Sequence, residues 1–151
     1  MTADHEPAVP SLRVGGEDEE LSRRLDQELT AFNARATGAG EPVEFSVRAA
    51  DAAGELAGGL TGWFWGSLCG IEMLWVREDQ RHEGWGTRLM REAEAAAGRR
   101  GCTDILVSSY SFQAPGFYKR LGYRETGRLN GVPGGHQDVY LQKTVGVAAT
   151  P

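Results

Sequence analysis

The chain contains few residues of the kinds that staple small proteins or hold metal ions. Only two cysteines and three histidines occur among its 151 residues. Cys69 and Cys102 each lie beside a glycine, and their separation is not the short spacing of a metal-ligand motif. They are therefore predicted to be small buried thiols. A chain of this length can bury a core without disulfides or metal, and no metal site is predicted.

Long hydrophobic stretches are also missing. No apolar run reaches the length of about 18 residues that a membrane-spanning helix needs. The acidic N-terminal stretch lacks the apolar centre of a secretory signal peptide, so the cytoplasm is the expected location. Sixteen Lys and Arg residues against 21 Asp and Glu give a net charge of −5, which argues against a broad basic surface for nucleic acid. Neither a nucleic-acid partner nor a membrane partner is predicted.

The composition is that of one ordinary globular domain, with 40% apolar and 25% charged residues. We expect this domain to span residues 11–146, between a tail at 1–10 and a tail at 147–151. Pro7, Pro10 and the scarcity of apolar groups predict disorder in the first tail.

Hydrophobic periodicity predicts the secondary structure. Apolar residues recur every three or four positions over Asp18–Ala36, which indicates a helix with one apolar face, formed by Leu21, Leu25, Leu29 and Phe32. Alternation over Val43–Ala50 indicates a half-buried strand. Further strands are predicted at Ser11–Val14, Leu56–Trp65, Ile71–Val76, Asp104–Ser109, Tyr123–Leu129 and Asp138–Val145. Further helices are predicted at Gly86–Arg99 and Pro115–Leu121.

The segment Arg81-His82-Glu83-Gly84-Trp85-Gly86 joins a predicted strand to a predicted helix. Glycines let a backbone approach a ligand closely. The first N–H groups of a helix have no partner within it, and the helix dipole adds positive potential there. These are the physical parts of a phosphate-binding turn, to which Thr87 adds a hydroxyl. The spacing is neither a dinucleotide fingerprint nor a P-loop.

The pattern Arg-x-x-Gly-x-Gly resembles the pyrophosphate motif of the GNAT superfamily of acyl-CoA-dependent N-acyltransferases. A second segment, Phe117-Tyr118-Lys119-Arg120-Leu121-Gly122-Tyr123, is similar to the Phe-Tyr-x-x-x-Gly-Phe/Tyr segment of that family and lies at the usual distance. The resemblance covers about Val43–Val145. It implies an α/β (α+β) fold with a mixed, centrally splayed β-sheet flanked by helices.

The resemblance also implies how a co-substrate would bind. Acetyl-CoA or another short acyl-CoA would place its pyrophosphate on Arg81–Thr87 and its pantetheine arm beside the backbone of Leu74, Trp75 and Val76. Ser111 stands where the family often has an asparagine that bonds the coenzyme, and Ser109 or Gln113 can share this task. The sequence departs from the family in two places. His82 stands where many members have glycine, which requires a permissive backbone angle, and Glu78 stands where many have proline.

Tyr118 is implied by the resemblance to be the general acid that protonates the leaving thiolate. A phenol with a pKa near 10 can donate to a thiolate whose conjugate acid has a pKa near 8.5. For the base that deprotonates the amine, Glu72 is the first candidate. In a regular strand its side chain lies on the same face as those of Leu74 and Val76. A carboxylate in an otherwise apolar strand is costly to bury, which suggests a functional role. His136, at the end of the loop Gly131–Gly135, is the second candidate base.

The acceptor is expected to be a primary amine, with a small molecule favoured and an antibiotic or a protein N-terminus also open. Trp63 and Trp65 share one strand face and can wall an acceptor pocket, although core filling is the other interpretation. His136 can also reach the acceptor. Two alternatives stand beside this hypothesis: a non-catalytic acyl-CoA-binding or regulatory domain, and an acyltransferase whose donor is bound to a carrier protein. A homodimer is common in the family.

Overall fold

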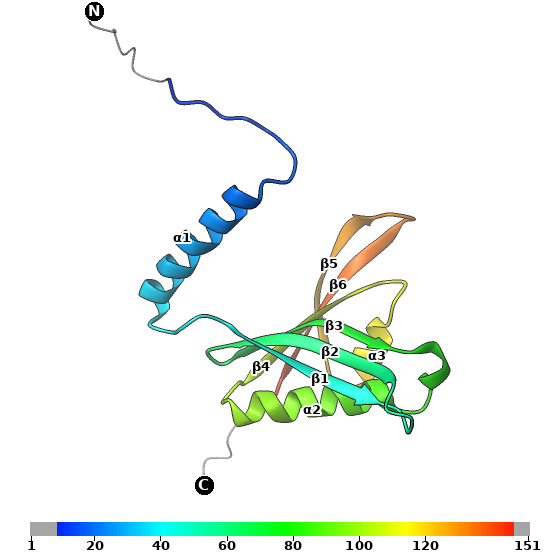
Figure 1. The fold of residues 1–151 in the computed structure, drawn as a ribbon. Helices are drawn as coiled ribbons and strands as arrows, with labels where there is room; N and C mark the ends of the chain where they lie inside the picture. Colours follow the sequence, from blue (N-terminus) through cyan, green and yellow to red (C-terminus); the bar gives the residue numbers. More distant parts are fainter. Residues whose placement is uncertain (1–8, 147–151) are drawn as a thin grey trace, which may run out of the picture. The chain divides into compact units, whose positions relative to one another are not determined.

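The computed structural model describes residues 9–146, which divide after Gly38 into two compact units. The first unit contains helix α1, Glu19–Thr37 (Figure 1). Asp18 caps its start by accepting a hydrogen bond of 2.9 Å from the N–H of Leu21. Gly38 ends it in the left-handed conformation, with φ of 66°. The predicted helix is thus confirmed to within one residue at each end.

The predicted first strand, Ser11–Val14, is wrong. These residues form no regular structure, and no segment of the described chain pairs with them. A strand needs a neighbour to satisfy its backbone N–H and C=O groups, and a short apolar pattern alone does not supply one. Most of the predicted N-terminal tail and all of the C-terminal tail lie outside the described residues. Among residues 9–146, no helix is both long and apolar enough to cross a membrane.

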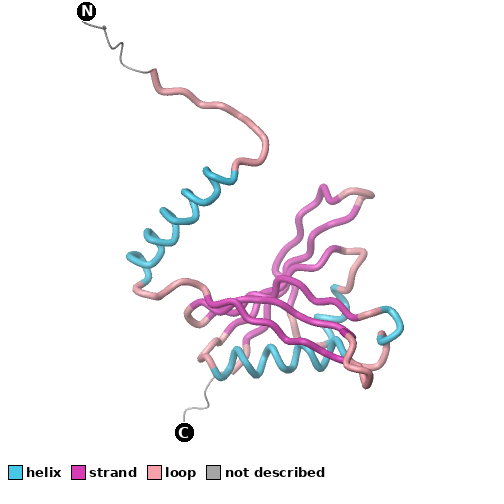
Figure 2. The backbone as a smooth tube through the Cα atoms, in the orientation of Figure 1, coloured by secondary structure: helices cyan, strands magenta, loops and turns pink. Residues whose placement is uncertain are grey.

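The second unit is built on one six-stranded sheet with the order β1-β2-β3-β4-β6-β5 (Figure 2). Its pairs are antiparallel except for β3 with β4, which is parallel, so the sheet is mixed. The elements are β1 Val43–Ala50, β2 Leu56–Trp65, β3 Leu68–Val76, the 3-10 turn Glu78–Gln80, α2 Trp85–Arg99, β4 Asp104–Tyr110, α3 Pro115–Arg120, β5 Arg124–Val132 and β6 His136–Thr144. Each element predicted after residue 40 is confirmed: β1 and β2 have the predicted bounds, and the ends of the other elements are shifted.

Helix α2 covers one face of the sheet and forms the core with it (Figure 1). Its buried face consists of Leu89, Met90, Ala93 and Ala97, which recur at helical spacing. These side chains join buried strand residues in a single apolar cluster, whose largest fully buried side chains include Leu60, Ile105, Val139 and Leu141. Alternation along the strands sends the intervening side chains to the opposite face of the sheet.

The sheet opens in its middle, between β3 and β4. These strands pair only over Leu68–Ile71 and Asp104–Val107. β3 then continues to Val76 and β4 to Tyr110 without a shared ladder. The opening is the central splay that the sequence resemblance implies, and it leaves the backbone of both strands available to a ligand.

Candidate active site

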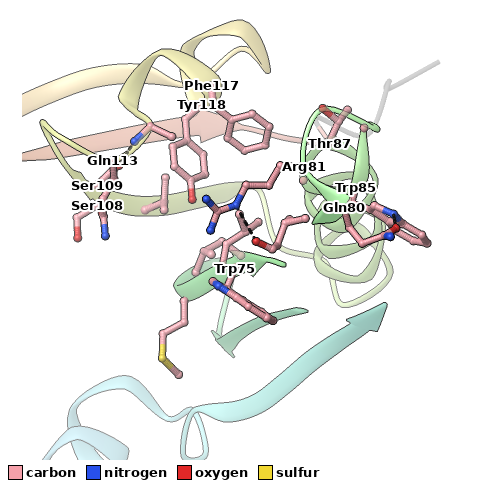
Figure 3. A pocket seen from close by; sticks show the side chains of 18 of the residues that line it. Trp75, Gln80, Arg81, Trp85, Thr87, Ser108, Ser109, Gln113, Phe117 and Tyr118 are labelled. Atoms are coloured by element: carbon pink, nitrogen blue, oxygen red, sulfur yellow. Dashed lines mark hydrogen bonds between the residues drawn. The ribbon is translucent and has the colours of Figure 1, made fainter. Parts of the chain in front are cut away.

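A cavity of about 1050 Å³ lies where β3 and β4 diverge. Helix α2 contributes its first turn to the wall and α3 contributes an aromatic pair (Figure 3). The volume lies at the upper end for small-molecule sites. The lining residues are Ile71, Glu72, Met73, Leu74, Trp75, Val76, Gln80, Arg81, His82, Gly84, Trp85, Gly86, Thr87, Val107, Ser108, Ser109, Phe112, Gln113, Ala114, Phe117 and Tyr118.

The start of α2 presents unpaired N–H groups to this cavity. Gly84 is its N-cap, with φ of 82°, and contributes no side-chain cap. The first helical bond runs from the N–H of Arg88 to the carbonyl of Gly84, at 3.1 Å. The N–H groups of residues 85–87 therefore have no partner within the helix, and no acidic side chain stands in the first turn. The arrangement favours an anion at this position.

His82 has φ of 67° and is the one non-glycine residue with positive φ among the described residues. Histidine tolerates this region better than bulky residues do, so the departure from glycine in the sequence leaves the turn intact. Gly86 has a packing role. A Cβ at Gly86 would lie 3.2 Å from the ring of Phe117, closer than most real contacts. The missing side chain thus lets the first turn of α2 approach α3.

Arg81 reaches back across the cavity. Its Nε donates a hydrogen bond of 2.9 Å to the carbonyl of Val76, the last residue of β3 (Figure 3). The side chain of Trp85 points away from the centre of the cavity, where its Nε1 bonds Gln80 Oε1 at 3.3 Å. The guanidinium of Arg88 lies 4.2 Å over its ring. These contacts hold the turn from the outside, and Arg88 adds positive charge beside the helix start.

Tyr118 on α3 is 6% exposed and points its hydroxyl into the cavity (Figure 3). Its ring makes edge contacts with Phe117 and Tyr123, with centroid distances of 5.1 and 5.9 Å. Among residues 9–146 the hydroxyl has no hydrogen-bond partner. Burial raises the pKa of the phenol, because the charged phenolate is disfavoured where water is scarce. Tyr118 is therefore a protonated donor aimed at open space.

Glu72 lies in the cavity wall, but its setting differs from the prediction. The register between β2 and β3 shifts at Thr61/Gly62, so that Glu72 is the extra residue of a β-bulge. The bulge breaks the parity that the sequence predicts with Leu74 and Val76. The side chain is exposed rather than enclosed among apolar neighbours, and no other described residue pairs with its carboxylate.

On the β4 side, Ser109 and Gln113 line the cavity, whereas Ser111 does not. The hydroxyl of Ser111 accepts a bond of 3.0 Å from the N–H of Gln137 and lies 3.3 Å from Nδ1 of His136. It fastens the turn after β4 to the start of β6. His136 is likewise outside the cavity lining, at the edge of Phe112, whose ring does contribute to the wall.

The remaining predicted residues lie outside the cavity. Glu83 borders a smaller depression that includes Asp51 and Arg88. The ring of Trp63 covers Gly70, where a Cβ would lie within 2.3 Å of its atoms. Trp65 donates from Nε1 to the carbonyl of Gly40 at 2.9 Å. Both tryptophans thus fill space on the sheet face opposite α2.

Several wall residues were not predicted from the sequence, among them Gln80, Ser108 and Phe112. Ser108 follows Val107, the last β4 residue paired with β3, so its place depends on where the sheet opens. Gln80 follows from the 3-10 turn. Among residues 9–146, no group of three or more His, Cys, Asp or Glu side chains is placed to hold a metal ion.

Comparison with known proteins adds independent findings. The model of the acetyltransferase (GNAT) family matches residues 11–123. The blasticidin-S acetyltransferase of Streptomyces morookaense is 35% identical over 133 residues, which cover 85% of this chain and 91% of that protein. These matches include β3, α2, β4 and α3, the elements that form the cavity.

Solved structures agree at the level of the fold. An acetyltransferase from Bacillus cereus ATCC 14579 superposes with a TM-score of 0.80 at 31% identity, over 89% of this chain and 98% of that one. An aminoglycoside 6'-N-acetyltransferase, solved with coenzyme A, superposes with a TM-score of 0.61 at 20% identity, over 84% of this chain and 92% of that one.

Proposed function

Because this chain belongs to the GNAT family of acetyltransferases, we propose that it transfers an acetyl or other short acyl group from acyl-CoA to a primary amine of a small molecule. The observation that carries the proposal is the continuous cavity from the start of α2, through the opening between β3 and β4, to Tyr118. A helix start that favours an anion and a proton donor in one cavity match the pyrophosphate and the thioester sulfur of acyl-CoA.

The donor is positioned by backbone groups. The unpaired N–H groups of residues 85–87 and the hydroxyl of Thr87 face the pyrophosphate. The pantetheine arm lies along Leu74–Val76, where β3 has no neighbouring strand on the β4 side. Arg81 bonds the Val76 carbonyl in the described structure, so it must release this carbonyl if the arm bonds there. The relative solved with coenzyme A supports this assignment by its shared fold.

The reaction needs one proton removed and one supplied. The neutral amine nitrogen attacks the thioester carbon, a C–N bond forms, and the C–S bond breaks with the electron pair leaving on sulfur. Glu72 accepts the excess amine proton through water, since its carboxylate lines the cavity and is accessible. Tyr118 gives its proton to the thiolate and regains one from solvent. Backbone N–H groups of β3 stabilise the oxyanion formed between these steps.

A small-molecule acceptor is supported by the named relatives. The Streptomyces relative is named for acetylation of blasticidin S, and the structure solved with coenzyme A is named for an aminoglycoside. We assign the acceptor to the part of the cavity lined by Glu72, Met73 and Phe112. We therefore place the antibiotic amines first among the candidate acceptors.

An amine panel with acetyl-CoA tests the proposal. The panel contains blasticidin S, an aminoglycoside and a short peptide with a free N-terminus, and the readout is thiol release with mass spectrometry of the product. The control omits the amine and measures hydrolysis. We expect amine-dependent thiol release and an acetylated small molecule. A protein that binds CoA but releases no thiol with any amine is an acyl-CoA-binding domain, and that outcome would overturn the proposal.

A further inference from the structure

Two buried side-chain oxygens among residues 9–146 have no hydrogen-bond partner: Thr61 Oγ1 and Asp138 Oδ1. Strand alternation places both on the sheet face opposite α2, because their neighbours Leu60 and Val139 are core residues. They lie on either side of the central opening, Thr61 on β2 and Asp138 on β6. A buried oxygen without a partner costs stability, so such a group needs an explanation.

Asp138 is the more demanding of the two, since a carboxylate is harder to leave unpaired than a hydroxyl. No Lys or Arg among the described residues forms an ion pair with it. Its carboxylate interacts with the phenol of Tyr140. The hydrogen bond to Asp138, followed by the charge of that carboxylate, raises the pKa of the Tyr140 phenol. The carboxylate therefore keeps one oxygen unused and a local excess of negative charge.

Aromatic residues occupy neighbouring positions on β6 and on β4 with the turn that follows it. Tyr110 on β4 is the direct cross-strand partner of Asp138, and it stacks on Phe112 with a centroid distance of 5.5 Å. Phe112 meets the edge of His136 at 4.8 Å, two residues before Asp138 on β6. A carboxylate that has one oxygen without a partner and stands beside aromatic residues is a favourable place for an organic cation.

This cluster adjoins the acceptor end of the cavity. Ser108 lines the cavity and pairs with Tyr140, while Tyr110, two residues further on, pairs with Asp138. At the rise of a strand, Asp138 thus lies roughly 7 Å along the sheet from the position opposite Ser108. Phe112 lines the cavity and also stacks on Tyr110. A ligand in the cavity can span this distance with a short chain.

We infer that Asp138 and its aromatic neighbours bind a second cationic group of the acceptor, an ammonium or guanidinium that is not acetylated. The inference rests on the proposed acetyl transfer to an amine and specifies its substrate class. The acceptor carries two positive groups about 7–10 Å apart. One is held at Asp138, and the other is presented as the amine near Glu72.

Three amines of equal chain length test this inference: 1,6-diaminohexane, hexylamine and 6-aminohexanoate. They end in a cation, a methyl group and an anion. We expect the diamine to have the lowest KM and aminohexanoate the highest. Asp138→Asn keeps the shape and removes the charge, so it should raise the KM of the diamine by about 10- to 100-fold, as expected for a hydrogen bond between charged groups. It should leave kcat and the KM of hexylamine near wild type.

Asp104→Asn is the matched control. Asp104 is a carboxylate on the same sheet face and the same pair of strands, but it is satisfied by Gln142 and Thr144. Its loss should not change the order of the three amines. Calorimetry of the diamine with CoA-loaded protein gives the same comparison where turnover of the probes is slow. A wild type that binds diamine and hexylamine alike, or an Asp138→Asn protein that keeps the diamine preference, would overturn the inference.

Failure of the proposed function has a different signature. There, coenzyme A does not bind or no amine in any panel is acetylated, whatever residue stands at position 138. A carboxylate that merely tunes the fold would shift the melting temperature of Asp138→Asn and affect the three amines equally, which also contradicts the inference.

Discussion

At the scale of the residue, we propose that single side chains carry out the proton transfers in the cavity, and Tyr118 has the best-defined setting among them. It is nearly buried, its hydroxyl faces open space, and burial raises its pKa. It therefore stays protonated through the neutral range and keeps a proton to donate. Tyr118→Phe removes the hydroxyl and keeps the ring contacts with Phe117 and Tyr123.

We expect Tyr118→Phe to lower kcat by about 10²- to 10⁴-fold, the usual contribution of a general acid. The affinity for CoA should hardly change, because we place the phosphates at the start of α2. The loss should shrink for an acyl donor whose thiol has a low pKa, since that leaving group needs less protonation. Single-turnover kinetics with both donors measure the effect. Wild-type kcat where chemistry is rate-limiting would return Tyr118 to a packing role.

The structure distinguishes the two candidate bases, Glu72 and His136, more clearly than the sequence does. The first lines the cavity, whereas the second lies beside Ser111 and outside the lining. We expect Glu72→Gln to lower kcat/KM by about 10²-fold or more at neutral pH and to flatten its rise with pH. His136→Ala should change kcat/KM mainly through the KM of the acceptor amine. The reverse pattern in pH–rate profiles of the two variants would assign the base to His136.

At the scale of elements, we expect CoA binding to depend most on the start of α2. Gly84 has φ of 82°, and nothing lies within 4 Å of the position that a Cβ would take, so the residue is glycine for its backbone angle rather than for space. Gly84→Val should shift this angle and turn the following N–H groups away, because a β-branched residue is strained there. Gly84→Asn tolerates the angle and is the matched control.

We expect Gly84→Val to weaken CoA binding about tenfold or more, as the loss of hydrogen bonds to a charged group predicts. Gly84→Asn should bind nearly as well as wild type. Calorimetry of CoA binding to folded variants makes the comparison. Equal weakening in both would point to side-chain bulk, and equal wild-type affinity would contradict the placement of the pyrophosphate.

Elements with regular periodicity could be predicted from the sequence, but departures from regularity could not. The alternation in Val43–Ala50 and the apolar stripe of α2 reflect burial on one face, which a sequence records directly. The bulge at Glu72 depends instead on the register with β2. The parity assigned to Glu72 was therefore wrong, although its place in the cavity wall followed from its strand.

At the scale of the whole molecule, the site is assembled from segments that only the fold brings together. The turn at Arg81–Thr87 and the pair Phe117–Tyr118 could be identified from their motifs, and both line the cavity. The role of Ser111 could not, because its hydroxyl is used by the start of β6. The partners of a side chain depend on chain segments far away in sequence. Dimerisation and the single-domain boundary 11–146 stay predictions.

Four weak acids are buried in the core: Cys69, Cys102, Tyr118 and Tyr123. Burial, and then the charge of Cys102, raise the pKa of Cys69 to about 12. Burial also raises the pKa of Cys102, Tyr118 and Tyr123. All four groups are neutral when protonated, so each keeps its proton in the folded state at a pH where the unfolded chain has lost it. The unfolded state then binds fewer protons, and the free energy of unfolding falls as pH rises.

This linkage predicts alkaline destabilisation with a defined window. The stabilisation that comes from these raised pKa values is fully present below about pH 8.5, the pKa of a thiol in an unfolded chain. It should decline from there through the folded-state pKa of about 12 for Cys69, by up to about 1.4 kcal/mol per pH unit for each fully titrating group. Urea unfolding at a series of pH values, with reductant present, measures the decline.

Cys69→Ala should reduce the slope of the unfolding free energy against pH between about pH 9 and 11, whatever its constant effect on stability. The control Thr103→Ala should leave this slope unchanged. If Cys69→Ala keeps the wild-type slope, the Cys69 thiol titrates alike in both states, and the alkaline loss must come from Cys102 and the two tyrosines.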